Sequence, residues 1–189
     1  AHYNGSGWRK IESGTDLDIY DIYGDTARDG SQEILAVASN VIQNNGSKLF
    51  KLEEFLVQPV NTSGLPWSLT GLWFAPSRGY YVVGDGIYTK RKLTDSAWQP
   101  MHGALTSFYT GSVYGKESNN VFCIGSFMEV LHFNGATWKS YRDQIPIQGG
   151  AHTGVYVSKN IVLISGYTGR VATLTIGRRS LEKGGRDGK

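Results

Sequence analysis

The sequence has one cysteine, only five prolines and no long apolar run. The single Cys123 excludes an internal disulfide, and its apolar neighbours Val121, Phe122 and Ile124 predict a small buried side chain rather than a nucleophile. No apolar stretch approaches the roughly 18 residues that a membrane-spanning helix needs. The net charge is only +3, and basic residues crowd the last dozen positions, so the sequence predicts neither a membrane span nor a nucleic-acid partner.

Convincing helical periodicity is also missing, which predicts almost no helix. What the chain has instead is glycine and aromatic residues: 25 Gly, 11 Tyr and 5 Trp in 189 residues. This composition is typical of many short strands joined by tight turns. We therefore expect an all-β fold.

A hairpin motif recurs along the chain. In His132–Lys139, the pair Asn134-Gly135 suits a type I′ turn, because both central residues must adopt positive φ, and Trp138 follows on the outgoing strand. The aromatic residues that follow the four versions of this turn are 40 to 48 residues apart, a spacing typical of repeat folds. The four residues are Trp8, Phe50, Trp98 and Trp138.

The predicted unit is a four-stranded antiparallel meander of about 45 residues. Four first strands align without gaps, with an aromatic residue at one position, and the second strands end in small residues. Such a sheet cannot cover both its faces alone, so we expect four units packed radially as the blades of a β-propeller. The aligned aromatic residues are Tyr23, Trp73, Tyr114 and Tyr156, and the small residues are Ala38, Gly84, Gly125 and Gly166.

The predicted propeller covers residues 1–179, with a disordered basic tail at 180–189. The fourth unit lacks a last strand, so we predict that strand 8–12 closes the ring by joining it, which would remove two open edges. The alternative is a piece of a larger propeller, or a half ring completed by a second copy, which adds self-association to the predicted partners. The predicted blades span 17–52, 68–101, 108–142 and 151–176.

These turns and first strands resemble those of secreted or surface β-propeller repeat proteins of bacteria. Residues Gly135 to Trp138 are similar to the end of the Asp-box hairpin of sialidase-type propellers, although the aspartate is missing from its usual place. The resemblance implies an extracellular or periplasmic location. It carries over no catalytic residue, because the sialidase arginine cluster with its tyrosine and acid is not found.

In a propeller, the turns between second and third strands share one face with the connections between blades. Acids, a histidine, an arginine and aromatic residues are expected on this face, where aromatic rings could stack on sugars and the polar groups could bond hydroxyls. The alternative is an ordinary polar rim. The predicted ligand-binding residues are Asp18, Trp67, Asp85, Tyr109, Glu129, His152, Tyr167 and Arg170, and Asp16, Asn40 and Phe127 are expected beside them.

No motif predicts a metal, a cofactor or a catalytic group. The histidines lie in separate repeats without metal-ligand spacing, and Asp16, Asp18 and Asp21 lack the glycine and final glutamate of a calcium loop. We therefore expect a non-catalytic binding module for a glycan or a protein. The alternative is a glycoside-processing enzyme, or a fragment of one, that uses Asp18, Asp85 and Glu129 at the mouth of the channel.

Overall fold

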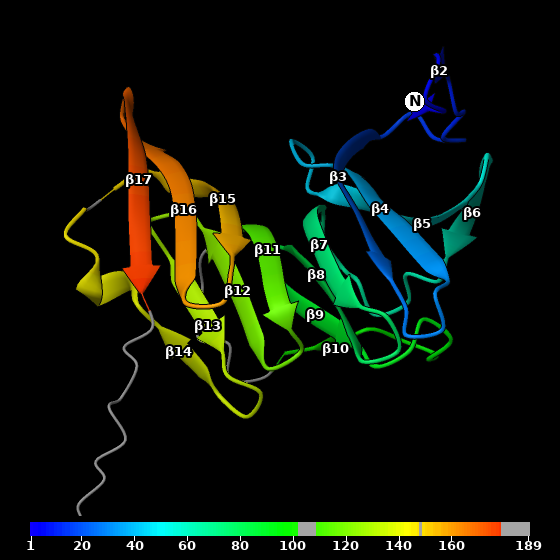
Figure 1. Ribbon diagram of the computed structural model, residues 1–189. Helices are drawn as coiled ribbons and strands as arrows, with labels where there is room; N and C mark the ends of the chain where they lie inside the picture. Colours follow the sequence, from blue (N-terminus) through cyan, green and yellow to red (C-terminus); the bar gives the residue numbers. More distant parts are fainter. Residues whose placement is uncertain (102–108, 148, 179–189) are drawn as a thin grey trace, which may run out of the picture.

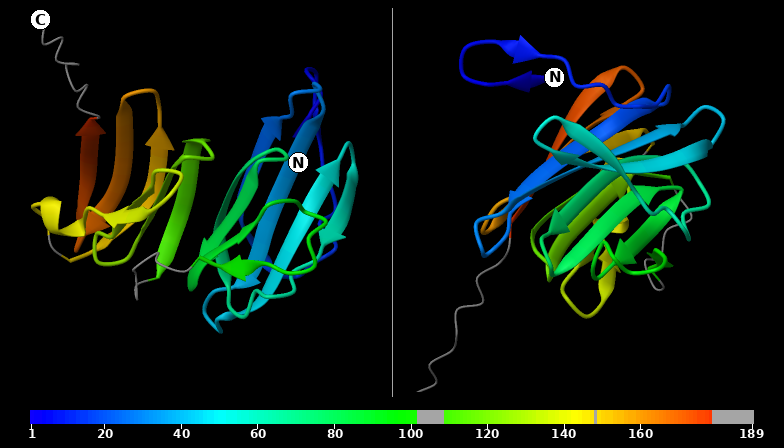
Figure 2. Two further views of the ribbon diagram at one scale, coloured as in Figure 1. Left: turned by 90° about the horizontal axis from the view of Figure 1, so that it is seen from below. Right: turned by 90° about the vertical axis from the view of Figure 1, so that its right-hand side faces the viewer.

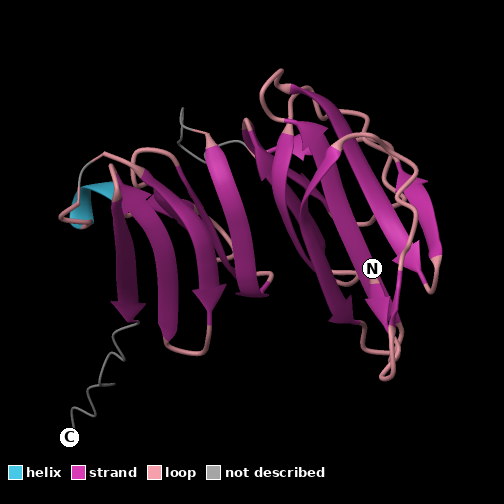
Figure 3. Ribbon diagram, turned by 90° about the horizontal axis from the view of Figure 1, so that it is seen from above, coloured by secondary structure: helices cyan, strands magenta, loops and turns pink. Residues whose placement is uncertain are grey.

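The computed structural model describes residues 1–101, 109–147 and 149–178. Within these ranges almost every element is a strand, and one short 3₁₀ turn, η1 (Arg142–Gln144), is the exception (Figure 3). The described ranges include no helix that could cross a membrane. The all-β class predicted from the sequence is confirmed, while the predicted tail at 180–189 lies outside the described residues.

Four antiparallel sheets follow one another along the chain, and we call them blades 1 to 4. In each blade the strands are hydrogen-bonded in sequence order, as the predicted meander requires. Blade 1 contains β3 (Asp18–Thr26), β4 (Gln32–Asn40), β5 (Asn45–Glu53) and β6 (Leu56–Val60), and blade 2 contains β7 (Leu69–Ala75), β8 (Gly79–Gly84), β9 (Gly86–Lys90) and β10 (Gln99–Pro100).

Blade 3 has four strands, and blade 4 has three among the described residues, as the sequence predicted for its missing last strand. The chain also begins with a separate hairpin of two short strands. Blade 3 contains β11 (Thr110–Glu117), β12 (Asn120–Gly125), β13 (Val130–Phe133) and β14 (Trp138–Ser140), blade 4 contains β15 (Ala151–Val157), β16 (Ile161–Thr168) and β17 (Val171–Arg178), and the hairpin is formed by β1 (His2–Tyr3) and β2 (Trp8–Arg9).

The four first strands share one irregularity that the sequence did not reveal. Each carries one extra residue near its start, so that the pairing with the second strand shifts at the same place in every blade. Such a β-bulge bends the strand and increases its twist. The extra residues are Tyr20, Thr70, Gly111 and Thr153.

Beyond the bulge, the predicted alignment of aromatic residues is confirmed, because each of the four pairs with the equivalent residue of its second strand. Their rings also meet across blades. The Tyr23 ring centroid lies 6.4 Å from that of Trp73 and 6.0 Å from that of Tyr114, and Tyr114 lies 5.5 Å from Tyr156. The first strands therefore gather along one inner line of the molecule.

The blades are arranged in an arc, with blade 1 at one end and blade 4 at the other (Figures 1 and 2). First strands contact one another in the order β3, β7, β11, β15, which matches the radial packing of a propeller. Between neighbouring blades lie apolar clusters, such as the one in which Leu35 and Val37 of blade 1 pack on Leu72 and Phe74 of blade 2. These clusters hold the blades together.

The predicted closure of the ring is not what the structure shows. Strand 8–12 was expected to join blade 4, but Trp8 and Arg9 pair instead with Tyr3 and His2 in the N-terminal hairpin. This hairpin lies beyond blade 1, at the opposite end of the arc from β17 (Figure 1). A local pairing across a tight turn has replaced the long-range one, and the arc is open among the described residues.

The predicted alignment of the repeat is also wrong in blade 1. Residues 41–44 form a turn, so Asn44 and Gly46 lie at the junction of the second and third strands rather than before the last strand of the predicted blade 17–52. Phe50 is therefore on β5, the third strand, and β6 lies beyond residue 52, where the predicted blade ends. An Asn-Gly turn fits any tight antiparallel junction, so the motif alone does not fix the strand number.

Candidate functional site

The turns between second and third strands lie at one end of the blades, and we call this end the upper face. As predicted, Asp85, Glu129 and Arg170 lie in or beside such turns, while Asp18 and His152 lie at the starts of first strands, which reach the same end. Burial separates the predicted residues into two groups. Asp18, Trp67, Asp85, Tyr167 and Arg170 are exposed, Tyr109 is half-buried, and Glu129 and His152 are buried.

Glu129 and His152 are brought together, but inside the protein rather than on its surface. The Ser140 hydroxyl donates to Glu129 Oε1 at 2.7 Å, and Nδ1 of His152 lies 3.3 Å from the Glu129 carbonyl. A carbonyl can only accept, so Nδ1 carries a proton in this contact. The His152 ring therefore connects the first strand of blade 4 to the β12–β13 turn of blade 3, while the Glu129 carboxylate is bonded within blade 3. Both side chains are buried, so neither is available to a ligand.

Burial also gives His152 a measurable effect on stability. Desolvation lowers the pKa of the His152 ring below its ordinary value of 6.5, against a smaller opposing effect of the bond to Glu129. Above pH 6.5 both the folded and the unfolded ring are neutral. As the pH falls through 6.5 towards the lower folded pKa, the unfolded chain binds the proton first, so the fold loses stability.

We expect urea unfolding to show a lower free energy of unfolding at pH 5 than at pH 7.5, with part of that difference abolished by His152→Gln. The control is His2→Gln on the exposed N-terminal hairpin, which should leave the pH dependence as in the wild type. An unchanged pH dependence in His152→Gln would contradict the assignment of a buried neutral ring.

Trp67 and Asp85 are brought together through Asn44, a residue that the sequence pattern did not single out. The Asn44 amide donates to Asp85 Oδ2 at 3.4 Å and accepts from the Ser68 hydroxyl at 2.7 Å. The Ser47 hydroxyl also bonds the Trp67 carbonyl. The upper turn of blade 1 is thus tied to blade 2, which fixes the backbone under the exposed Trp67 ring.

A second exposed group lies between blades 3 and 4 and is formed by Phe127 and Tyr167, which are 54% and 49% exposed. Phe127 has a φ of 55°, a left-handed conformation that is uncommon for a bulky residue. Its N–H donates to the Gly150 carbonyl at 2.8 Å, and Arg142 Nε donates to its carbonyl at 3.1 Å. The turn is therefore held rigidly while the ring faces solvent.

Gly150 lies against the backbones of both of these aromatic residues. A Cβ on Gly150 would lie 1.9 Å from the Tyr167 carbonyl oxygen, so only glycine allows the connection to pass there. The same residue accepts the hydrogen bond of Phe127. The connection between blades 3 and 4 thus links both backbones, and we call Phe127 and Tyr167 with the adjoining Arg142 the aromatic patch.

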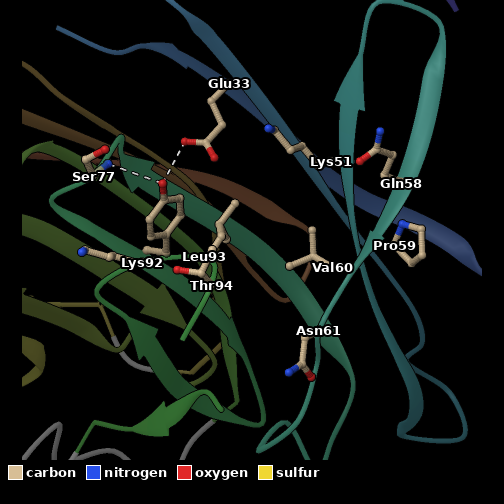
Figure 4. A pocket seen from close by; sticks show the side chains of 11 residues that line it. Glu33, Lys51, Gln58, Pro59, Val60, Asn61, Ser77, Lys92, Leu93 and Thr94 are labelled. Carbon is tan, nitrogen blue, oxygen red and sulfur yellow. Dashed lines mark hydrogen bonds between the residues drawn. The ribbon is translucent and has the colours of Figure 1, made fainter. Parts of the chain in front are cut away.

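A groove of about 510 Å³ lies at the opposite end of the junction between blades 1 and 2 (Figure 4). The sequence pattern did not reveal it, because β6, which forms one wall with Pro59 and Val60, reads as a connection. Three of its polar side chains are already paired: the Tyr80 hydroxyl donates to Glu33 Oε2 at 2.9 Å, and Lys51 Nζ lies 2.6 Å from Oε1 of Glu53 outside the groove. Desolvation, together with the hydrogen bond to Glu33, raises the pKa of Tyr80 to about 12.

The described residues include no group of three or more histidine, cysteine or acidic side chains placed to hold a metal ion. Cys123 is buried, as its neighbours predicted, and burial raises the pKa of its thiol. Among the carboxylates, Asp21 is half-buried and accepts the Leu72 N–H at 2.9 Å, and desolvation raises its pKa. This bond joins the first strands of blades 1 and 2.

Comparison with known proteins identifies the fold. No protein-family model and no curated protein matches the chain. Among solved structures the chain is similar to YCF48 bound to D1 peptide, with a TM-score of 0.67 and 17% sequence identity. The match covers 93% of this chain and 55% of that chain, so the present chain spans little more than half of its length. YCF48 is a β-propeller, and the predicted propeller fold is thereby supported.

Proposed function

We propose that this chain is a non-catalytic propeller module that binds a peptide segment of a partner protein at the aromatic patch on the upper face. The observation that carries the proposal is Phe127. Its exposed ring stands on a left-handed backbone whose N–H and carbonyl are both hydrogen-bonded. Backbone strain of this kind persists only where the surroundings hold it, and it occurs preferentially at binding sites.

The composition of the patch fits protein recognition. Aromatic residues and arginine are enriched among the residues that contribute most to protein interfaces, and rigid presentation lowers the entropy cost of binding. Phe127 and Tyr167 supply two rings from different blades, and Arg142 contributes a cation beside them. The structural neighbour YCF48 is bound to a peptide, which supports a peptide as the class of ligand.

The hydrogen bonds of Glu129 and Asp85 weigh against the alternative of a glycoside-processing enzyme. A glycoside-processing enzyme needs two carboxyl groups about 5–10 Å apart across a pocket. Of the three acids predicted for that role, Glu129 has its carboxylate bonded to Ser140, and Asp85 is bonded to Asn44. These bonds favour a binding module over a hydrolase. A glycan ligand is an outcome that the following experiment distinguishes.

Selection of a phage-displayed random peptide library on the full chain is expected to enrich peptides that bind the patch. Fluorescence anisotropy with a labelled selected peptide should show a dissociation constant about 30-fold higher for Phe127→Ala, which corresponds to about 2 kcal/mol. Tyr167→Ala should weaken binding by about fivefold or more.

Two variants control this measurement. Phe127→Gly keeps the left-handed backbone accessible and removes only the ring, so it should lose binding as Phe127→Ala does. Phe55→Ala removes an exposed ring at the opposite end of blade 1 and should bind like the wild type. Failure to enrich any peptide, binding that survives loss of both rings, or binding on a glycan array instead would overturn the proposal.

A further inference from the structure

The outer face of blade 4 is apolar and exposed. Its three strands place Tyr156, Leu163 and Ile176 side by side in register, and Leu174 stands beside them with 66% of its surface exposed. The opposite face of the same sheet contains Val155, Val162 and Ile164, which pack against blade 3. Blade 4 therefore has one face in the core and one equally apolar face without cover among the described residues.

Blade 3 shows what covers such a face. Val130 of blade 3 occupies the register position that Leu174 has in blade 4, and it is only 3% exposed because blade 4 packs on it. The neighbouring Ile124 is likewise buried. The surface that fits the outer face of blade 4 is thus the face with which a blade packs on the preceding blade, as blade 4 does on blade 3 with Val155, Val162 and Ile164.

The other end of the arc supplies a face of that kind. Ile22 of β3 aligns with Leu72 of β7 and Val155 of β15, which pack against the preceding blade in their own junctions. No blade precedes β3 among the described residues, and Ile22 is 57% exposed. The chain therefore carries both halves of one blade junction, separated by the length of the arc.

The N-terminal hairpin adds a strand to the same argument. His2 pairs with Arg9 and Tyr3 with Trp8, which is the register in which His132 pairs with Lys139 and Phe133 with Trp138 in the outer strands of blade 3. Blade 4 ends at β17 in the described residues, without a fourth strand. The hairpin thus provides an outer strand at one end of the arc, and blade 4 has no outer strand among its described residues at the other end.

We propose that two copies of this chain close a ring, with blade 4 of each copy packed on blade 1 of the other and β2 added to the partner's β17. A second copy fits because each molecule offers both complementary faces, so two identical junctions leave no blade face uncovered.

Sedimentation velocity over a concentration series tests this proposal on the full chain. The wild type is expected to be a dimer that dissociates on dilution, and Leu174→Glu or Ile22→Glu should each raise the dissociation constant at least about tenfold, because a charge is then buried in the junction. The matched control is Ile42→Glu, which introduces the same charge at a 96% exposed residue outside both faces.

Mixing the two weakened variants distinguishes this junction from any other dimer. A dimer of one Leu174→Glu chain and one Ile22→Glu chain has one intact junction, between blade 4 of the Ile22→Glu chain and blade 1 of the Leu174→Glu chain. The mixture should therefore dimerise more tightly than either variant alone. A wild type that stays monomeric at every concentration, or a mixture no tighter than its components, would overturn the proposal. Circular dichroism of each variant confirms that it is folded.

Discussion

Replacing Trp73 by alanine is expected to lower the free energy of unfolding by about 3–5 kcal/mol. Trp73 is on the first strand of blade 2, is 2% exposed and packs in the apolar cluster that joins blades 2 and 3. Its ring centroid lies 5.8 Å from that of Tyr81, and a Cβ on Gly115 of blade 3 would lie 2.8 Å from its ring atoms. The space left by the ring cannot be filled without moving a blade.

Urea unfolding followed by circular dichroism measures this loss. Trp67→Ala is the matched control, because Trp67 is an exposed residue of the same type on the upper face, and its replacement should change stability by no more than about 0.5 kcal/mol. Equal losses for the two variants would show that packing between blades is not what holds the arc together.

Gly125→Ala is expected to destabilise the fold by about 2–3 kcal/mol or more, and the loss should exceed any effect of alanine on strand propensity. Gly125 ends the second strand of blade 3, where a Cβ would lie 2.0 Å from the Tyr109 carbonyl oxygen and 2.9 Å from Thr110 Cα. That carbonyl cannot retreat freely, because it accepts the Ser126 N–H at 2.9 Å. The clash is therefore between two backbone segments.

Gly7→Ala serves as the control, since Gly7 lies in the N-terminal hairpin and a Cβ there would meet no atom within 4 Å. Thermal unfolding should show a clearly lower midpoint for Gly125→Ala and an unchanged one for Gly7→Ala. A Gly125→Ala protein as stable as the wild type would mean that the backbone of Tyr109 and Thr110 is not held against the end of β12. Blade 1 has Ala38 at the same register position, so this loss of stability is expected only in blades 2 to 4, which have glycine there.

The candidate site follows from the sequence only in outline. The positions of the turns depend on strand order, so the sequence places Asp85, Glu129 and Arg170 at one end of the blades. Exposure does not follow from strand order. Whether Glu129 faces solvent depends on Ser140 from a different strand, and the backbone of Phe127 is held by a hydrogen bond to Gly150 in the connection between blades 3 and 4.

The amino-acid sequence by itself determined the blades. Alternating apolar residues and tight turns specify local meanders, and an aromatic residue at one position of each first strand is enough to align Tyr23, Trp73, Tyr114 and Tyr156. Only the tertiary structure decided where Trp8 pairs, which strand holds Phe50 and which carboxylates are buried. The physical reason is the separation along the sequence of the residues that make each contact. Hairpins form between neighbouring residues, whereas closure of the arc and burial of a side chain depend on contacts between distant segments that no short pattern encodes.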